Sequence, residues 1–499
     1  MKLFQKYLYP SLTIIGFAAV YFATRLYSIM SLPLFTDEAI YTRWSQIARY
    51  DASWRFISLT DGKQPMFVWW DMVFMRFTSD PLLAGRLVSV ACGALTVVGL
   101  YFVGKEIFKN KWVGIISAAL YVLYPFGLVY DRMALYDTMV GTFTIWSLYF
   151  LILQARNPRA WVAFLLGLIL GGGMLTKTSA NFSWYLLPAT LLLFDWRKKD
   201  IKMRLAKWIV FSAIAIILAN VYYSILRLSP YFHIIGDKNS VFVYPLHDWL
   251  AHPFTFLPGN LSGLWDWFST YLTYSVLGLL VGGLIVFKKY LKEKIVLVIY
   301  FVVPFLLLAL FGRTLYPRFI LFMTLPLLPI VALFLVWLYE KLRKRLFLVL
   351  CALVLFFALW VRSDYLIITD FPHATIAKAD LTQYINDWPA GGGIKETIAY
   401  LADKSKQGKI YVASEGTFGS LPTYAVEIYL GDDRNVEKGG IWPVPDQIPQ
   451  DLLDKAKKMD TYMIFYQMPT KPLWPLTLIA QYRKGVGNVY LRLYKVNAQ

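Results

Sequence analysis

Cysteine and acidic residues are scarce in this chain, and each scarcity excludes a class of protein. Only two of the 499 residues are cysteine, which excludes a disulfide framework, and neither lies at zinc-site spacing. Asp and Glu total 31 against 50 Lys and Arg, so the formal net charge is +19. A basic balance of this size is common in nucleic-acid-binding proteins. No basic run with interleaved aromatic residues accompanies it, and we predict no nucleic-acid partner.

Apolar residues are abundant instead. They make up 58% of the chain, and the mean hydropathy is +0.50, which is more apolar surface than soluble cores of this size can bury. Stretches of roughly 18 or more apolar residues, the length needed to cross a bilayer, recur over the first 360 positions. We predict a polytopic α-helical membrane protein with about eleven spanning helices. They centre near residues 18, 92, 120, 144, 167, 187, 217, 277, 303, 328 and 352.

The short loops between these spans differ in charge. Five of them carry clusters of Lys and Arg, near residues 105–111, 156–159, 197–207, 288–294 and 341–345. Such clusters face the cytoplasm and contact anionic membrane lipids, so we expect the N-terminus on that side of the plasma membrane as well. The first span, about residues 7–30, lacks a small-residue cleavage site and is expected to remain as an anchor.

The composition changes near residue 362, where long apolar runs stop and charges spread evenly. We therefore predict a transmembrane domain, residues 1–361, and a soluble α/β domain, residues 362–499. With an odd number of spans, the second domain lies outside the cytoplasm. Expected strands cover residues 409–413, 461–467, 476–482 and 489–496, and expected helices cover 394–404, 422–430 and 451–458. The glycine run 391–393 lacks the flanking strand of a phosphate-binding loop and is predicted to be a turn.

The long outer loop of residues 31–79 contains the most informative polar residues. Apolar residues recur at helical spacing over residues 40–48, which predicts an amphipathic helix lying in the membrane interface. Residues 66–77 predict a second interfacial helix. Two carboxylates, Asp37 and Glu38, stand at the start of the first one.

These carboxylates have two compatible interpretations. Thr36 or Asp37 can cap the helix, with Glu38 favourably placed in its first turn. A carboxylate pair held at the membrane surface can also deprotonate a hydroxyl beside a lipid headgroup, and a residue at a helix start is rigidly aimed for that task.

Further polar residues fall on the same outer side. Lys63 follows a turn at headgroup depth, where a cation is well placed to bind phosphate. Asp131 and Arg132 are adjacent and could simply pair with each other. Asp137 is harder to dismiss, because it lies at the start of an apolar span, where carboxylates are costly and usually functional or paired.

Lys177, Tyr316 and Arg318 complete the outer set. A basic residue at a helix end can merely extend its head into water, but all of these residues share one face of the membrane. We therefore expect one outer cavity lined by acidic and cationic clusters. Of the four histidines, His233, His247 and His252 share the second long outer loop, about residues 229–265; their spacing matches no ligand pattern, and we predict no metal site from them.

At these residues the chain resembles the GT-C glycosyltransferases that use lipid-linked sugars. The likeness is greatest to the bacterial branch of protein O-mannosyltransferases and aminoarabinose transferases. The matching segments are Phe35-Thr36-Asp37-Glu38, Lys63-Gln64-Pro65, residues 132–138, Leu175-Thr176-Lys177 and Tyr316-Pro317-Arg318. The likeness covers residues 1 to about 340. Gln64 departs from it, since relatives often have proline there, and residues 362–499 carry no matching motif.

The resemblance implies transfer of a hexose or pentose, with inversion, from a polyprenyl-phosphate sugar to a hydroxyl of a protein, lipid or glycan acceptor. It implies that the reaction takes place at the extracytoplasmic face. Asp37 would be the general base. Lys63 and Arg318 would bind the donor phosphate, with Arg132 and Lys177 as further candidates.

The same resemblance places other residues around the substrates. Glu38 and Asp137 would orient the acceptor or a bound divalent metal, which the branch does not require uniformly. Asp131 and Tyr316 belong to the same expected substrate-binding set. No other cofactor is implied.

Two other functions remain open at this point. A lipid-linked glycan flippase or transporter would show repeated halves and broken helices with charges near the bilayer midplane, and the sequence has no internal repeat. An O-antigen ligase or polymerase would concentrate its acids and bases in one large periplasmic loop. The polar residues here instead follow several spans, which favours the transferase.

Overall fold

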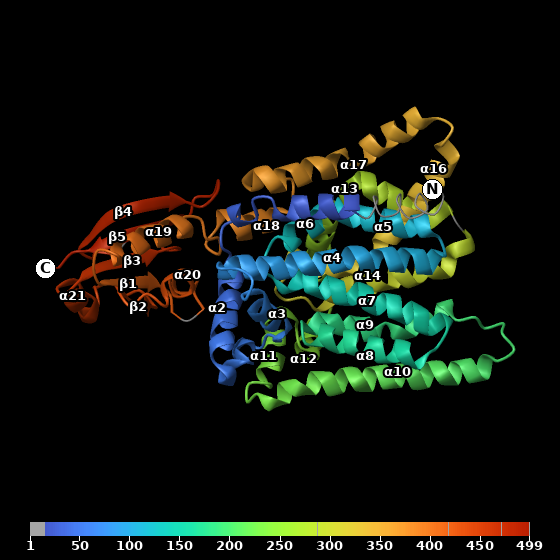
Figure 1. The fold of residues 1–499 in the computed structure, drawn as a ribbon, viewed down its shortest axis with the longest axis horizontal. Coiled ribbons are helices and arrows are strands. Elements are labelled where there is room, and N and C mark those ends of the chain that lie inside the picture. Colours follow the sequence, from blue (N-terminus) through green and yellow to red (C-terminus); the bar gives the residue numbers. More distant parts are fainter. Residues whose placement is uncertain (1–14, 287, 418, 471, 499) are drawn as a thin grey trace, which may run out of the picture.

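The chain forms a helical bundle with a smaller α/β domain at one end (Figure 1). The structure, a computed structural model, describes residues 15–286, 288–417, 419–470 and 472–498. The predicted fold class, a polytopic helical membrane protein with a C-terminal α/β domain, is confirmed.

The bundle consists of long apolar helices running in a common direction (Figure 1). In the described residues seven helical segments are long and apolar enough to cross a bilayer, or eight if α5 and α6, bent by 59°, form one span. The long helices are α4 (Pro81–Phe108), α7 (Tyr136–Arg156), α10 (Ile201–Tyr223), α13 (Leu257–Val286), α14 (Leu291–Phe311) and α17 (Leu346–Thr369). The remaining long segment, Pro317–Leu342, ends with α16 (Leu328–Leu342). The shorter ones are α5 (Lys111–Val122), α6 (Pro125–Asp131) and α8 (Ala160–Met174).

The expected count of eleven spans stays a prediction. α8 has only 15 residues, and the segment near residue 187 is divided into η4 (Thr178–Asn181), α9 (Phe182–Tyr185) and η5 (Leu187–Leu193). Pro188 lacks the backbone N–H that a continuous helix through this segment would need. Residues 15–26 of the first span are helical, and the start of that span lies outside the described residues.

Both long outer loops gather at the bundle end that faces the small domain (Figure 1). There α2 (Thr36–Tyr50) lies across the ends of the long helices, close to α3 (Met66–Phe74). The other elements of these loops are η1 (Ile29–Ser31), η2 (Ala52–Trp54), η3 (Ile57–Asp61), η6 (Ser224–Leu228), α11 (Ile234–Phe242) and α12 (Leu246–Ala251). A third connection adds η8 (Pro317–Ile320), α15 (Leu321–Thr324) and η9 (Leu325–Leu327), and η7 (Lys288–Tyr290) precedes α14.

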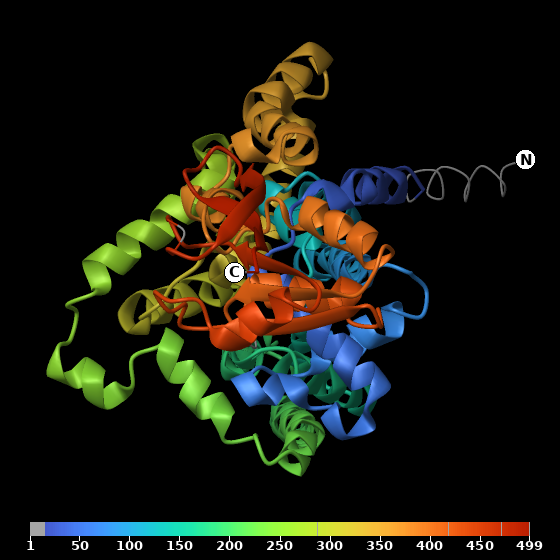
Figure 2. The ribbon, with the colours of Figure 1, turned by 90° about the vertical axis from the view of Figure 1, so that its left-hand side faces the viewer.

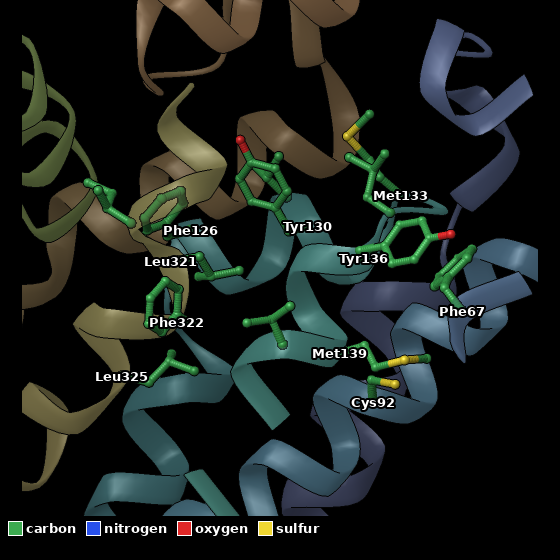
Figure 3. Packing of buried hydrophobic residues seen from close by; sticks show 14 of the residues in the cluster. Phe67, Cys92, Phe126, Tyr130, Met133, Tyr136, Met139, Leu321, Phe322 and Leu325 are labelled. Carbon is green, nitrogen blue, oxygen red and sulfur yellow. The ribbon is translucent and has the colours of Figure 1, made fainter. Parts of the chain in front are cut away.

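Apolar packing fixes this end of the bundle (Figure 3). Phe67 of α3, Met139 of α7 and Leu321 of α15 are almost fully buried. The Phe67 ring lies 5.1 Å from the ring of Tyr136, at the start of α7. A close-packed core of this kind resists independent shifts of its elements, so the outer ends of α3 and α7 are held in one arrangement. Cys92 belongs to this core.

The small domain contains a five-stranded mixed sheet in the order β2-β1-β3-β5-β4. β1 pairs in parallel with β2 and β3, and β5 pairs antiparallel with β3 and β4. The strands are β1 (Ile410–Glu415), β2 (Val436–Ile441), β3 (Asp460–Phe465), β4 (Leu476–Arg483) and β5 (Tyr490–Val496). The helices are α19 (Ile394–Ser405), α20 (Leu421–Leu430) and α21 (Gln450–Ala456).

The domain sits over the end of the bundle (Figure 2). α17 continues through Thr369, beyond the predicted boundary at 361/362, and η10 (Phe371–His373), α18 (Lys378–Leu381) and η11 (Thr382–Asn386) then lead to α19. α20 lies directly against α2, since Arg43 Nε is 2.8 Å from Glu427 Oε2. The helix that carries Asp37 is therefore enclosed between the bundle and the domain.

Candidate functional site

Asp37 lies in the first turn of α2, and its carboxylate is not used to cap that helix. The N-cap residue is Phe35, whose N–H donates to Glu38 Oε2 at 3.1 Å. The Thr36 hydroxyl donates to the Pro389 carbonyl at 2.9 Å. The predicted cap by Thr36 or Asp37 is therefore wrong. Glu38 accepts the N–H of the N-cap residue, so the Asp37 carboxylate is available for other partners.

Two cations contact the Asp37 carboxylate. Arg318 Nη1 lies 2.8 Å from Oδ2, and Lys63 Nζ lies 3.6 Å from Oδ1. Burial alone would raise the pKa of Asp37, but the charges of Lys63 and Arg318 outweigh it and hold that pKa well below its usual range. Asp37 is thus an anion at neutral pH, and residues from two separate outer loops meet at it.

Lys63 connects Asp37 to the second outer loop. Its ammonium is 3.3 Å from Asp61 Oδ2, while Lys238 of α11 is 2.6 Å from Asp61 Oδ1. The ammonium also lies 4.8 Å from the centre of the Tyr41 ring, a cation–π distance. The chain of alternating charges Asp37–Lys63–Asp61–Lys238 links α2, the turn after η3 and α11.

Asp137 and Lys177 form a second ion pair at the same bundle end. Lys177 Nζ lies 2.7 Å from Asp137 Oδ1, and the Asp137 side chain is 7% exposed. Burial lowers the pKa of Lys177 in spite of the neighbouring Asp137 carboxylate. The Lys177 ammonium also lies 4.5 Å from the ring of Phe319, the residue that follows Arg318 in the chain. The intramembrane carboxylate is thus paired, and its partner reaches the same loop that supplies Arg318.

Gln64, the departure from the expected motif, ties two of these loops together. Its Nε2 donates to Thr178 Oγ1 at 2.9 Å, and the Met66 N–H donates to the Leu175 carbonyl at 3.0 Å. The Lys63 turn and the Lys177 turn are therefore held against each other by two hydrogen bonds, of which proline at position 64 could not make the first.

Arg318 is almost buried in an aromatic surround. Its guanidinium lies 5.0 Å from the Tyr316 ring and 5.8 Å from the Phe35 ring, and its side chain is 9% exposed. Within the described part of the chain its Nε has no hydrogen-bond partner. A planar cation with a free N–H suits a phosphate or carboxylate ligand.

Glu38, Asp131 and Arg132 have protein partners of their own. Glu38 is fully buried; it pairs with Arg86 of α4 at 2.8 Å and accepts the Ala134 N–H at 2.7 Å. These contacts fix α2 onto the bundle. The role of Glu38 in orienting an acceptor stays a prediction.

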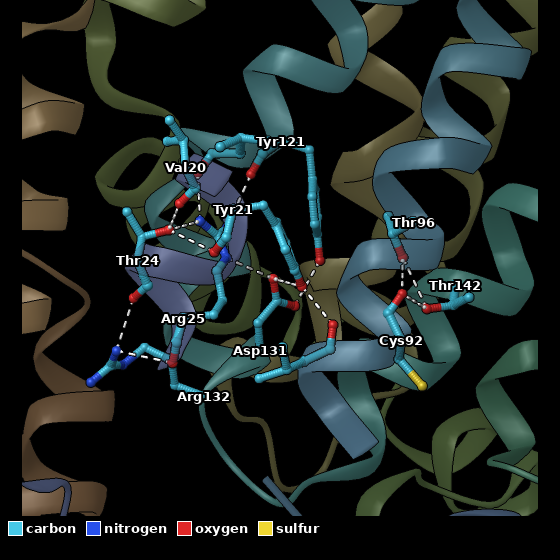
Figure 4. A network of polar contacts seen from close by, with 12 residues as sticks. Val20, Tyr21, Thr24, Arg25, Cys92, Thr96, Tyr121, Asp131, Arg132 and Thr142 are labelled. Atoms are coloured by element: carbon cyan, nitrogen blue, oxygen red, sulfur yellow. Dashed lines mark hydrogen bonds and ion pairs between the residues drawn. The ribbon is translucent and has the colours of Figure 1, made fainter. Parts of the chain in front are cut away.

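Asp131 and Arg132 do not pair with each other, so that expectation is wrong. Asp131 Oδ2 lies 3.2 Å from Arg25 Nε, and the Tyr121 hydroxyl donates to Asp131 Oδ1 at 2.8 Å (Figure 4). Arg132 donates to the carbonyls of Thr24, Arg25, Tyr27 and Ser28. The two residues hold residues 21–28 against the bundle, and their expected contact with substrate stays a prediction.

Sequence reasoning missed Arg86 and Asp380 at this end of the bundle. Arg86 lies inside an apolar span, and the rarity of a buried cation there is a signal that could have found it. Asp380 stands in a mixed-polarity stretch with no such signal.

No metal centre is visible among the residues that the structure describes. No three His, Cys, Asp or Glu side chains of that set are grouped as metal ligands. Asp37, Asp61 and Asp137 each face a cation instead. His247 is exposed beside Asp248, and His233 contacts the Pro230 carbonyl.

The fold and this site define a class, a multi-pass membrane protein whose partly buried carboxylates and cations converge beneath a soluble domain at one end of the bundle. The family model of dolichyl-phosphate-mannose-protein mannosyltransferases matches residues 62–223. A comparison with curated proteins finds no match.

Solved structures share the fold across nearly the whole chain. ArnT from Cupriavidus metallidurans, bound to undecaprenyl phosphate, is 15% identical, with a TM-score of 0.53 and coverage of 98% of both chains. The oligosaccharyltransferase AglB from Archaeoglobus fulgidus, in complex with an inhibitory peptide and a dolichol-phosphate, is 12% identical, with a TM-score of 0.54. That match covers 93% of this chain and 70% of AglB. These solved structures show that the chain has the fold of the GT-C glycosyltransferases, and the family model covers residues 62–223 of it.

Proposed function

We propose that this protein transfers a sugar from a polyprenyl-phosphate donor to a hydroxyl acceptor, with inversion of the anomeric configuration. The family match supports glycosyl transfer. Two neighbours in fold were solved with polyprenyl phosphates, undecaprenyl phosphate in ArnT and a dolichol-phosphate in AglB. These findings support a lipid-phosphate-linked donor, whose sugar we leave as a hexose or pentose.

One observation carries the proposal. The Asp37 carboxylate is held between Lys63 and Arg318 at the outer bundle end, so a general base and two phosphate ligands share one place. A scaffold protein would not need such an arrangement. Burying charged groups costs free energy, and apolar packing could hold the same loops together without that cost.

In the proposed reaction, Asp37 accepts the proton of the acceptor hydroxyl while that oxygen attacks the anomeric carbon. The bond from this carbon to the phosphate oxygen breaks, and its electron pair leaves with the lipid phosphate. A single displacement by the acceptor oxygen, with no covalent intermediate on the protein, gives inversion. General-base help supplies about 10²–10⁴-fold, and the remainder comes from orientation and charge stabilisation.

The leaving phosphate remains ionised, so it needs cations rather than a proton donor. Lys63 and Arg318 are our choices, and Lys177 stands close enough to the same loop to contribute. In the resting protein the first two neutralise Asp37. A bound phosphate would draw them away, and the carboxylate would then regain the basicity that its ion pairs suppress.

We further propose that the site and the C-terminal domain lie outside the cytoplasm, with the N-terminus inside. The Lys/Arg-rich loops support this orientation, because basic loops stay on the cytoplasmic side. The acceptor would then be a protein, lipid or glycan of the cell envelope.

Asp37→Asn tests the proposal. We expect turnover to fall at least about 100-fold, since the amide cannot accept the proton, while binding of undecaprenyl phosphate stays nearly unchanged. Turnover is measured as undecaprenyl phosphate released from undecaprenyl-phosphate hexoses and pentoses in membranes that supply acceptors. Asp51→Asn, at the exposed far end of the same helix, is the matched control. An Asp37→Asn protein that keeps more than about a tenth of normal turnover would refute the base assignment.

A further inference from the structure

A buried carboxyl group lies where the small domain joins the bundle. Asp380 of α18 is fully buried. Its Oδ2 accepts hydrogen bonds from the hydroxyls of Tyr130 in α6, at 2.8 Å, and Tyr271 in α13. Tyr384 donates to the Tyr130 hydroxyl at 3.2 Å. Asp380 thus joins two bundle helices to the segment 378–391, which we call the strap.

The other half of the strap binds the start of α2. The Pro389 carbonyl accepts both the N–H and the hydroxyl of Thr36, at 3.1 and 2.9 Å. Ala390 forms a β-bridge with Phe35. A Cβ at Gly391 would lie 2.2 Å from the Leu34 carbonyl oxygen, so only glycine allows this close approach. The residue before Asp37 is therefore bonded directly to the strap.

A ring contact connects the first half of the strap to the start of α2. The Tyr384 ring meets the Phe35 ring edge-on, with centroids 4.8 Å apart, and Phe35 also faces the Arg318 guanidinium. An edge-on aromatic pair is worth about 0.5–1.5 kcal/mol beyond the area it buries. Displacement of Tyr384 would therefore remove a packing contact of Phe35, the N-cap of the helix that carries Asp37.

The domain holds the strap from its far side. Buried Lys484, just after β4, donates to the Trp388 carbonyl at 2.8 Å, and the Val486 N–H donates to Asn386 Oδ1 at 3.0 Å. The strap is thus fixed between the sheet and α2 and has little freedom to move alone.

We propose that the strap is part of the catalytic site and that Asp380 is a positioning residue, which aligns Asp37 through Tyr384 and Phe35. The inference rests on the proposed function, because it assigns a second carboxyl to the same reaction. It also gives the C-terminal domain a role: the domain supports the general base.

The charge of Asp380 changes in the neutral range. Burial raises the pKa of Asp380 to about 7, although the hydrogen bonds from Tyr271 and Tyr130 and the charge of Arg318 oppose the rise and Asp137 reinforces it. Tyr384 is the remaining titratable neighbour. The ionised form accepts both tyrosine hydrogen bonds, whereas the protonated form adds a donor to a cluster of donors. Because the two tyrosine hydrogen bonds lower the pKa of Asp380, their loss while the carboxyl stays buried would raise that pKa further. We therefore expect the hydrogen-bonded, aligned arrangement above pH 7 and its loosening below.

Asp380→Asn in the full-length protein tests this role, because the amide mimics the protonated acid at every pH. We expect kcat at pH 8 to fall about tenfold or more, as misplaced catalytic groups do, with the KM for the undecaprenyl-phosphate sugar unchanged. The change in kcat between pH 6 and 8 should disappear. Asp380→Glu should recover part of the kcat at pH 8 and part of its change between pH 6 and 8. The exposed control Asp370→Asn should match the unsubstituted protein in both quantities.

A second readout does not depend on activity. Amide hydrogen exchange at residues 34–39, compared between Asp380→Asn and Asp370→Asn at the same pH, should be faster in the Asp380 variant. Unchanged exchange together with an unchanged kcat profile would overturn the inference even if Asp37→Asn abolishes transfer. Faster exchange in a protein that shows no transfer with any donor would leave the strap's role standing and refute the proposed function.

Discussion

At the scale of single residues, the resting site opposes the activity proposed for it. A base held by Arg318 and Lys63 is weak, because each unit by which its pKa is lowered costs about 1.4 kcal/mol for proton acceptance. Donor binding resolves the conflict if the phosphate takes both cations. Since the pKa of Asp37 is lowered by folding, its contribution to stability is present above the unfolded value near 3.9 and is lost only as the pH falls below it.

Lys63→Ala and Arg318→Ala should therefore weaken donor binding. Hydrogen bonds to charged groups contribute about 1.5–3 kcal/mol, so we expect the apparent affinity for undecaprenyl phosphate to fall roughly 10- to 150-fold for each variant. Binding is measured by competition with a labelled lipid phosphate in detergent. Lys344→Ala, exposed beyond the end of α16, is the control. Unchanged affinity in both site variants would mean that the phosphate binds elsewhere.

At the scale of elements, the sequence predicted what composition and periodicity encode. All four expected strands and three expected helices of the C-terminal domain occur within a few residues of their expected limits. β2 was missed because Val436-Glu437-Lys438-Gly439-Gly440-Ile441 carries charges and two glycines of low strand propensity, and it pairs only at the sheet edge. Packing against β1 overrides that propensity.

The site was predictable only where a motif carried it. Asp37, Lys63 and Arg318 were predicted to share a pocket, and the structure brings them into contact. The partners of Asp131 and Arg132 were not predictable, because Arg25 and the carbonyls of residues 24–28 lie more than 100 positions away in the chain. Asp380 was not predictable for the same reason, because its tyrosine partners lie on two bundle helices more than 100 positions away in the chain.

The turn after η3 offers a prediction at this scale. Gly62 has a φ of +64°, and a Cβ there would lie 2.6 Å from the Ile234 carbonyl oxygen of α11. Gly62→Ala should therefore move α11 away from Lys63 and cost about 1–3 kcal/mol of stability. We expect a lower unfolding temperature in detergent and a higher KM for the donor.

Gly236→Ala provides the matched control within α11. A Cβ at Gly236 meets nothing within 4 Å, and alanine is favoured over glycine inside a helix. We expect equal or slightly higher stability and an unchanged donor KM. Equal behaviour of the Gly62 and Gly236 variants would contradict the idea that the approach of α11 fixes the Lys63 turn.

At the scale of the whole molecule, the basic loops and the acid–cation site lie at opposite ends of the bundle. The buried acid–cation site lies under the C-terminal domain, while the Lys/Arg-rich loops connect the opposite helix ends, such as the loop between α16 and α17 (Figure 1). Because basic loops resist transfer across the membrane, this separation supports the proposed orientation independently of the proposed chemistry.

Cysteine labelling tests that orientation in full. Cys92 is buried and Cys351 is exposed on α17, and both are replaced by alanine in the test background. Single cysteines are then placed at exposed Lys198 and Lys344, and at exposed Lys406 and Lys457 of the domain. In intact cells a membrane-impermeant maleimide should label positions 406 and 457, and reach 198 and 344 only after permeabilisation. The reverse pattern would put Asp37 in the cytoplasm, where the proposed outer-leaflet donor could not meet it.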